Sequence, residues 1–442
     1  MRLQEKLLQS FKARVESLNG SEPFFMNEMR TNAFDVFKNQ GFPTTKDEEW
    51  KYTSLKKIVS QEFKDFTNEP RLTSSEEIKA FLCPDVPSYK LIFVNGRFNS
   101  NLSSSASCED FFIGSMKEGM KAMPDLFASN YGGLASRDQS FVSLNTALAN
   151  QGAFVYVKKG VKLSKLVQVL FVNTNDEHPR MLNSRNLFLL EDRAEVQILE
   201  RHQSLDQGHV FSNVVTESYV GNKAFLKHFK IQNDLESSSI IDSTFVKQGE
   251  KSFALVDTFA FGGELIRNNL HFVFAGENAQ ANMDAITLLK GKTHVDHHTF
   301  VDHALPNCQS NQLYKGIYDE RSKGVFNGKV MVRKDAQKTN AFQQNNNLLL
   351  SDFASIDTKP QLEIFADDVA CSHGCTIGQL DKEALFYMQS RGIPLKEAKA
   401  FLMFAFAGDT LKNVSISPLK YLLIDFLAHA LKVDLKLNDL EV

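Results

Sequence analysis

The spacing of hydrophobic and polar residues changes twice along the chain. Up to about residue 80 apolar residues recur at helical intervals, as in "SEPFFMNEMRTNAFDVFKNQGF", where Ser21 and Glu22 are suited to start a helix and Gly41 to end it. From "SYKLIFVNGRF" onward, short alternating runs are separated by Gly, Asn, Asp and Ser, which predicts many short strands. Helical spacing returns at "GQLDKEALFYMQSRG" and continues to the end. The pattern predicts a helical region, a long β region and a second helical region.

The strand-like segments recur at a loose period. Several contain a small residue followed by alternating side chains, and Ala194, Ala224, Ala254 and Ala281 occur roughly every 30 residues. Such spacing is compatible with the coils of a β-solenoid, and a large β-sandwich is the competing architecture. The last helices are unusually rich in Phe and Leu, which suits either packing on their own body or docking of a partner.

Composition narrows the class of protein. The 442 residues carry 50 Lys and Arg against 53 Asp and Glu, a net charge of -3, which argues against binding to nucleic acid or anionic lipid. The first 20 residues lack the continuous apolar core of a signal peptide, and the most apolar stretch, "AFLMFAFAG", is too short to span a membrane. Five scattered cysteines without a CxxC pair fit reduced thiols. We therefore expect a soluble, cytoplasmic protein.

One candidate site lies in "VACSHGCTI". If this segment is extended, Cys371, His373 and Cys375 share one face of a strand. Cys371 and His373 then lie about 6.6 Å apart along the strand and can converge on one ion or one edge of a cluster, although two ligands are too few alone. Cys371 and Cys375, about 13 Å apart, are too distant for a disulfide. The alternative is an inward row of a buried strand.

A second candidate is "HVDHHTFVDH". On a strand His294, Asp296 and His298 would share a face and could bind a metal, whereas a polar ladder on a solenoid surface explains the same pattern. The signatures of P-loop ATPases, serine hydrolases, dinucleotide-binding folds and zinc proteases are missing, so we do not expect the chain to hydrolyse ATP itself.

Two longer segments carry a family resemblance. The run from "YKGIYDERSKGVFNGKVMV" to "CSHGC", together with "GFPTTKDEEWKYTSL", resembles the SufB/SufD family of iron–sulfur cluster assembly scaffolds, and its SufD-type members in particular. The resemblance implies a mostly β fold: an N-terminal helical region at 1–85, a central right-handed parallel β-helix (β-solenoid) at 86–378 and a C-terminal helical region at 379–442.

The resemblance also implies a function. It suggests a non-catalytic scaffold subunit of a SufBCD complex that pairs with SufB through the β-helix, binds the SufC ATPase through the C-terminal region and uses ATP only through SufC. Cys371 and His373 would hold a transient iron–sulfur cluster shared with SufB. Cys375 departs from the alanine of similar proteins, and we expect it to fill space. Flavin binding, cluster type and a homodimer of the isolated chain stay open.

Two other functions remain compatible with the sequence. One is a structural homodimer that binds metal at His294, Asp296 and His298. The other, less favoured, is a β-helix carbohydrate-active enzyme, which needs a cluster of carboxylates or basic residues along a groove that this sequence does not show.

Overall fold

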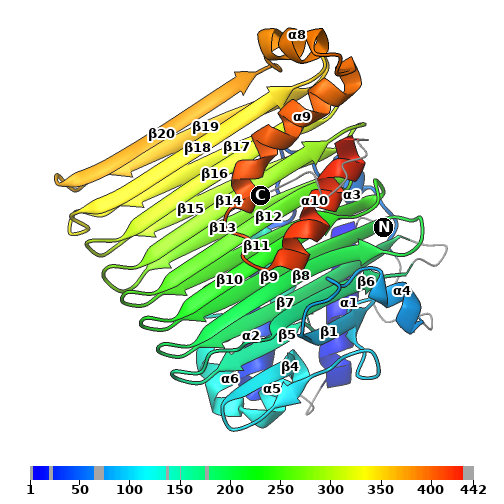
Figure 1. The fold of residues 1–442 in the computed structure, drawn as a ribbon. Coiled ribbons are helices and arrows are strands. Elements are labelled where there is room, and N and C mark those ends of the chain that lie inside the picture. The colour runs from blue at the N-terminus through cyan, green and yellow to red at the C-terminus, as the bar shows by residue number, and fades with distance from the viewer. Residues whose placement is uncertain are drawn as a thin grey trace.

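The chain folds into a flattened solenoid of two stacked sheets (Figure 1). The computed structural model describes residues 3–18, 23–63, 74–135, 139–149, 151–174 and 179–431. Ser21 and Glu22, the predicted helix start, lie outside these residues, and the helix that follows ends as predicted at Gly41, which has φ 68°. Parallel pairing between successive coils confirms a parallel β-solenoid and excludes the sandwich.

Each coil contributes one strand to each sheet. Sheet A contains, in spatial order, β2 (Arg97–Phe98), β1 (Ser88–Val94), β6 (Leu166–Asn173), β8 (Glu195–Ser204), β10 (Phe225–Asn233), β12 (Phe253–Gly262), β14 (Gln280–Leu289), β16 (Gln309–Tyr318), β18 (Thr339–Leu349) and β20 (Val369–Gly378). Sheet B contains β3 (Ala106–Ser107), β4 (Phe111–Ser115), β5 (Ala153–Val157), β7 (Arg180–Leu190), β9 (Val210–Val220), β11 (Ser238–Gln248), β13 (Leu265–Phe274), β15 (His294–His303), β17 (Lys323–Val332) and β19 (Ser355–Ile364).

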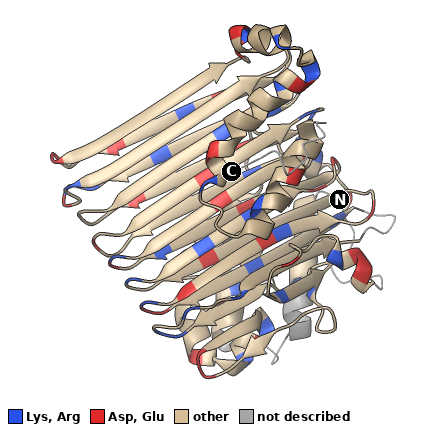
Figure 2. Ribbon diagram, viewed as in Figure 1, with Lys and Arg blue, Asp and Glu red and all other residues tan. Residues whose placement is uncertain are grey.

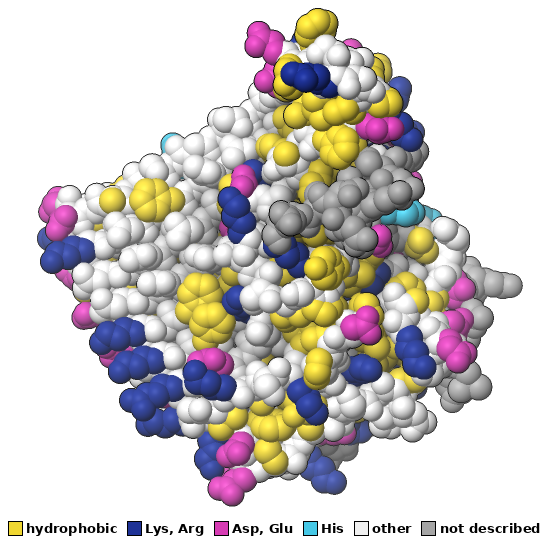
Figure 3. All heavy atoms as spheres, in the orientation of Figure 1, with side chains coloured by type: hydrophobic (Ala, Val, Ile, Leu, Met, Phe, Trp, Pro, Cys, Tyr) yellow, Lys and Arg dark blue, Asp and Glu magenta, His cyan; other side chains and the backbone are white. Residues whose placement is uncertain are grey.

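Small residues and sharp turns make the repeat regular. Ala194, Ala224, Ala254 and Ala281 are all buried in the core between the sheets, as the predicted period requires. The same turn position in successive coils is occupied by Arg193, Lys223 and Lys251. Each has a positive φ, which is unusual for residues other than glycine. Figure 2 shows charged residues of both signs along these turns, and Figure 3 shows basic side chains gathered at that rim. The core side chains therefore face inward, and the turns present charge to solvent.

Helices cover the outer faces of both sheets. The outer face of sheet B carries α1 (Leu3–Leu18), α2 (Phe24–Gln40) and α7 (Ser140–Leu148), whose apolar side chains pack on Phe211, Ile241 and Leu265. The outer face of sheet A carries α9 (Leu395–Gly408) and α10 (Ser417–Leu431) (Figure 1). None of the helices in the described part of the chain has the length and apolar character needed to cross a lipid bilayer.

The remaining helices are short. They are η1 (Glu48–Trp50), α3 (Lys56–Val59), α4 (Ser75–Lys79), α5 (Met116–Ala122), α6 (Pro124–Asn130), α8 (Lys382–Ser390) and η2 (Asp409–Leu411). The sequence pattern did not predict α5, α6 and α7, which interrupt the β region between β4 and β5.

Candidate functional site

The segment with the candidate thiols and imidazole forms β20, the last strand of sheet A. Its only strand partner in the sheet, within the described residues, is β18, and Cys371, His373 and Cys375 lie beside Ala341, Gln343 and Asn345. Those three β18 residues are the buried members of an alternating strand. The register therefore confirms that Cys371, His373 and Cys375 share the inward face, which here belongs to the open end of the solenoid.

The open end leaves these side chains accessible. Cys371 is half-buried against the core, whereas His373 and Cys375 are exposed. Burial raises the pKa of the Cys371 thiol, so it keeps its proton at neutral pH. Cys375 Sγ donates a hydrogen bond to Oγ1 of Thr358 on β19 at 3.4 Å. Because it is exposed, Cys375 does not fill an enclosed space within this chain, contrary to our expectation.

Exposed apolar side chains surround this end. Phe342, Phe353, Ile364, Phe365 and Ile377, from the last two coils and their turns, are between 38% and 72% exposed. In the part of the chain that the structure describes, main-chain groups of β20 on the side away from β18 meet no further strand of the sheet. An open strand edge with large apolar residues around it is typical of a surface that another chain covers.

The histidine-rich segment forms β15, where neighbouring residues point to opposite faces. His297 and His303 are buried, with hydrogen bonds to Thr287 Oγ1 at 3.0 Å and to Ser310 Oγ at 2.8 Å. His294, Asp296 and His298 occupy the outer face of sheet B, as predicted for one shared face of a strand.

The outer three residues are engaged in hydrogen bonds and ion pairs. Asp296 Oδ2 accepts hydrogen bonds from Arg267 Nη1 at 2.6 Å and from Thr53 Oγ1 at 2.5 Å, and its Oδ1 lies 2.9 Å from His298 Nε2. Burial alone would raise the pKa of Asp296, but Arg267 and His298 outweigh it and hold that pKa well below its usual range. Burial lowers the pKa of His294 to about 4, which keeps it neutral at neutral pH.

These contacts hold the N-terminal segment on sheet B. In the described residues, no group of three or more His, Cys, Asp or Glu is arranged to hold a metal ion. Instead, Arg267 lies over the ring of Trp50 at 3.8 Å, and Glu49 Oε2 lies 3.1 Å from His298 Nδ1. Glu48 pairs with Lys359 of β19 at 2.7 Å, so the segment reaches the last coil. Glu48 and Glu49 thus take part in this attachment.

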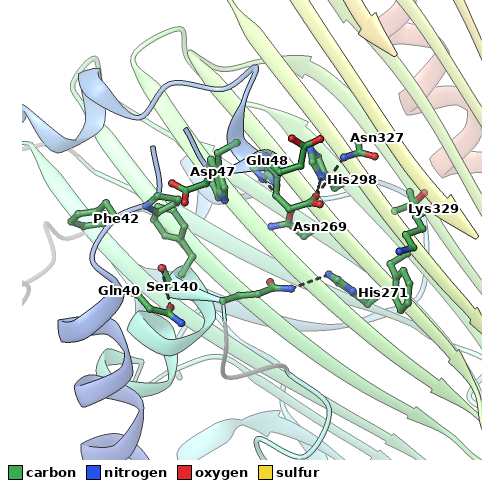
Figure 4. A pocket seen from close by; sticks show the side chains of 18 of the residues that line it. Gln40, Phe42, Asp47, Glu48, Ser140, Asn269, His271, His298, Asn327 and Lys329 are labelled. Atoms are coloured by element: carbon green, nitrogen blue, oxygen red, sulfur yellow. Dashed lines mark hydrogen bonds and ion pairs between the residues drawn. The ribbon is translucent and has the colours of Figure 1, made fainter. Parts of the chain in front are cut away.

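A cavity of about 670 Å³ lies between this segment and sheet B (Figure 4). Its lining mixes amide and aromatic side chains with charged ones, including Glu49, Asn327, His271 and Lys329. Two pairs of lining side chains are in contact: Glu49 Oε2 lies 3.1 Å from His298 Nδ1, and His271 Nε2 lies 3.4 Å from Gln139 Nε2. Burial lowers the pKa of His271 to about 4, so its ring is neutral.

The C-terminal helices have two apolar faces. Leu411, Leu423 and Leu427 are buried against sheet A, which shows that part of this apolar surface packs on its own body. Phe386, Tyr387, Leu395, Phe401 and Tyr421 are between 39% and 74% exposed, and Figure 3 shows hydrophobic side chains along these helices. Exposed aromatic and leucine side chains gathered in this way are typical of a surface that another chain covers.

Comparison with known proteins places the chain in a family. Residues 171–406 match the family described as "SUF system FeS cluster assembly, SufBD core domain", and residues 1–169 match "SufBD protein N-terminal region". The chain is 32% identical over 426 residues to an iron–sulfur cluster assembly SufBD family protein of Synechocystis, covering 94% of this chain and 93% of that protein. Proteins named iron–sulfur cluster assembly protein SufD are 30% identical in Escherichia coli, over 84% of both chains, and 24% identical in Bacillus subtilis, over 97% of this chain and 98% of that protein. The resemblance seen in the sequence is confirmed, and the chain belongs to the SufBD family of SUF-system iron–sulfur cluster assembly proteins.

Proposed function

We propose that this chain is a SufD-like scaffold subunit that pairs with SufB through the open end of its solenoid. The observation that carries the proposal is the position of Cys371 and His373 on the inward face of β20, the last strand of sheet A, among exposed apolar side chains. A second solenoid placed against β20 would satisfy its free main-chain groups and enclose the thiol and imidazole between the two chains.

Cys371 and His373 would be this chain's contribution to a shared cluster site. Thiolate is the usual ligand of iron–sulfur clusters, and imidazole replaces it in some of them. Their spacing of about 6.6 Å lets both side chains reach one edge of a cluster, and a thiolate from SufB would complete the ligand set. The raised pKa of Cys371 keeps the thiol protonated and weakly nucleophilic until iron or sulfur arrives.

The C-terminal helices would bind the SufC ATPase. Their exposed apolar face offers the surface, and the junction after α9 is fixed to sheet A, because Lys315 Nζ lies 2.7 Å from Asp409 Oδ2 and donates to the Phe406 carbonyl at 2.8 Å. Hydrolysis of ATP by SufC would move these helices and, through the solenoid, open the interface with SufB for iron and sulfide. On this proposal the chain itself catalyses no reaction.

Anaerobic cluster assembly on the co-expressed complex with SufB and SufC tests the proposal. We compare the native chain with His373→Ala and with Ser372→Ala, a matched control on the outward face of the same strand. Bound iron and sulfide should fall with His373→Ala and stay at the native level with Ser372→Ala, while size-exclusion chromatography shows the complex intact in both. Native levels of iron and sulfide in an intact His373→Ala complex would overturn the assigned site, and failure of the native chain to bind SufB would overturn the partnership.

A further inference from the structure

An unpaired polar atom lies beside the proposed site. Gln343 of β18 is the direct strand neighbour of His373, and both face inward. The Gln343 side chain is 1% exposed, and its Oε1 has no hydrogen-bond partner among the described residues. Leaving a buried acceptor unpaired destabilises a folded chain, so an unpaired carbonyl at this position calls for an explanation.

The surrounding coils fix the orientation of Gln343. Thr299 Oγ1 donates to Gln312 Oε1 at 2.7 Å, and Gln343 Nε2 donates to the same oxygen at 3.3 Å. Gln312 lies on β16, on the far side of β18 from His373, so the amide nitrogen is engaged away from the imidazole. Gly328 lies opposite, where a Cβ would come within 2.3 Å of Gln343 Nε2, so glycine leaves the room that this rotamer needs.

We propose that Gln343 is a positioning residue for His373. The structure shows no hydrogen bond between the two side chains; a rotation of the exposed His373 ring brings the N–H of one ring nitrogen to Gln343 Oε1, which selects one tautomer and turns the lone pair of the other nitrogen toward the open end. Adjacent strands are about 4.8 Å apart, a distance that an amide and an imidazole in the same inward row can bridge. Hydrogen-bond partners of this kind orient metal-binding histidines and make the other ring nitrogen a stronger ligand. The link to cluster assembly rests on the proposed function, whereas the hydrogen bond does not.

The tautomer of His373 tests the hydrogen bond without any cluster. We label the full chain with ¹⁵N-histidine, record ring nitrogen shifts by NMR at pH 8, and assign His373 from the signal lost in His373→Asn. The native chain should show a single tautomer. Gln343→Leu should give a mixture, Gln343→Glu should restore one tautomer because a carboxylate is also an acceptor, and Gln344→Leu, on the exposed face, should match the native chain. A native mixture, or a single tautomer unchanged in Gln343→Leu, overturns the proposal.

Cluster assembly supplies the functional arm. In the complex with SufB and SufC, we expect Gln343→Leu to lower bound iron about tenfold, in the range found for partners of metal-binding histidines, and Gln343→Glu to recover most of it. Circular dichroism checks that each variant folds. If His373→Ala leaves iron at its native level, the proposed function fails, while the NMR result still decides whether Gln343 orients the ring. Unchanged iron in Gln343→Leu, together with a loss in His373→Ala, overturns the positioning role alone.

Discussion

Two buried carboxyl groups beneath the C-terminal helices predict an unusual response to pH. Asp257 of β12 and Asp284 of β14 are direct strand neighbours on the outer face of sheet A, 1% and 6% exposed. Asn413 Nδ2 donates to Asp284 Oδ2 at 2.6 Å, whereas neither carboxylate oxygen of Asp257 has a hydrogen-bond partner within the described residues. Lys227 is the cation that acts on Asp257, and burial lowers the pKa of this lysine.

The sign of the effect follows from the two pKa values. Burial, and then the neighbouring Asp284, raise the pKa of Asp257 well above its usual range, and burial raises the pKa of Asp284 to about 6. Both carboxyl groups have a higher pKa in the folded than in the unfolded chain. At a pH between the unfolded and the folded pKa of such a group, folding therefore binds a proton. The free energy of unfolding then falls as the pH rises through the folded pKa values. The rise in the pKa of Asp284 to about 6 corresponds to roughly 3 kcal/mol of stability lost by pH 8.

Replacing one carboxyl group should relieve this loss. We expect Asp257→Asn to exceed the native chain in free energy of unfolding by about 1–3 kcal/mol at pH 8 and to equal it near pH 4, where both carboxyls are protonated. Urea unfolding followed by circular dichroism at pH 4 to 8 measures the difference between the two chains. Asp352→Asn, an exposed aspartate in a turn, is the charge-matched control and should follow the native curve. A variant that shows the native pH dependence, or is less stable at pH 8, would refute the reasoning.

Two further predictions concern buried ion pairs. Glu217→Gln should lower the free energy of unfolding in urea by about 3–5 kcal/mol, because it leaves the guanidinium of Arg185, 2.7 Å away and 1% exposed, without its counter-charge; a loss below about 1 kcal/mol would contradict this. Arg267→Met removes the cation over the ring of Trp50, the only tryptophan, and a partner of Asp296. The N-terminal segment should then be held less firmly, and the more hydrated Trp50 should emit at longer wavelength. Unchanged emission would contradict this, because it would show that the segment stays attached without this arginine.

Local alternation predicted much of the fold, because side chains on a strand alternate with a period of two. It placed His294, Asp296 and His298 on one face and put Cys371 and His373 on another shared face. The same logic cannot separate Gln343 from Gln344, since only the neighbouring strands decide which of two identical residues is buried.

Long-range contacts are beyond such patterns. The ion pair between Glu48 and Lys359 joins positions 311 residues apart, and nothing in either local sequence marks the other as its partner. Helices α5 and α6 have seven residues each, which is too short for an apolar period of 3.6 to stand out. Both features depend on the assembled solenoid and therefore appear only in the structure.

The stacking of coils also bears on how long the chain survives in a cell. An inner coil pairs with a neighbouring coil on each side, whereas the coil of β19 and β20 pairs, among the described strands, with a coil on one side only. In an array stabilised by contacts between adjacent repeats, the end repeat opens at a fraction of the global unfolding free energy. Proteases act on such opened segments. A copy whose end is covered by the proposed partner would therefore outlast a free copy. On that proposal, degradation, rather than synthesis, would match the amount of this chain to that of the partner.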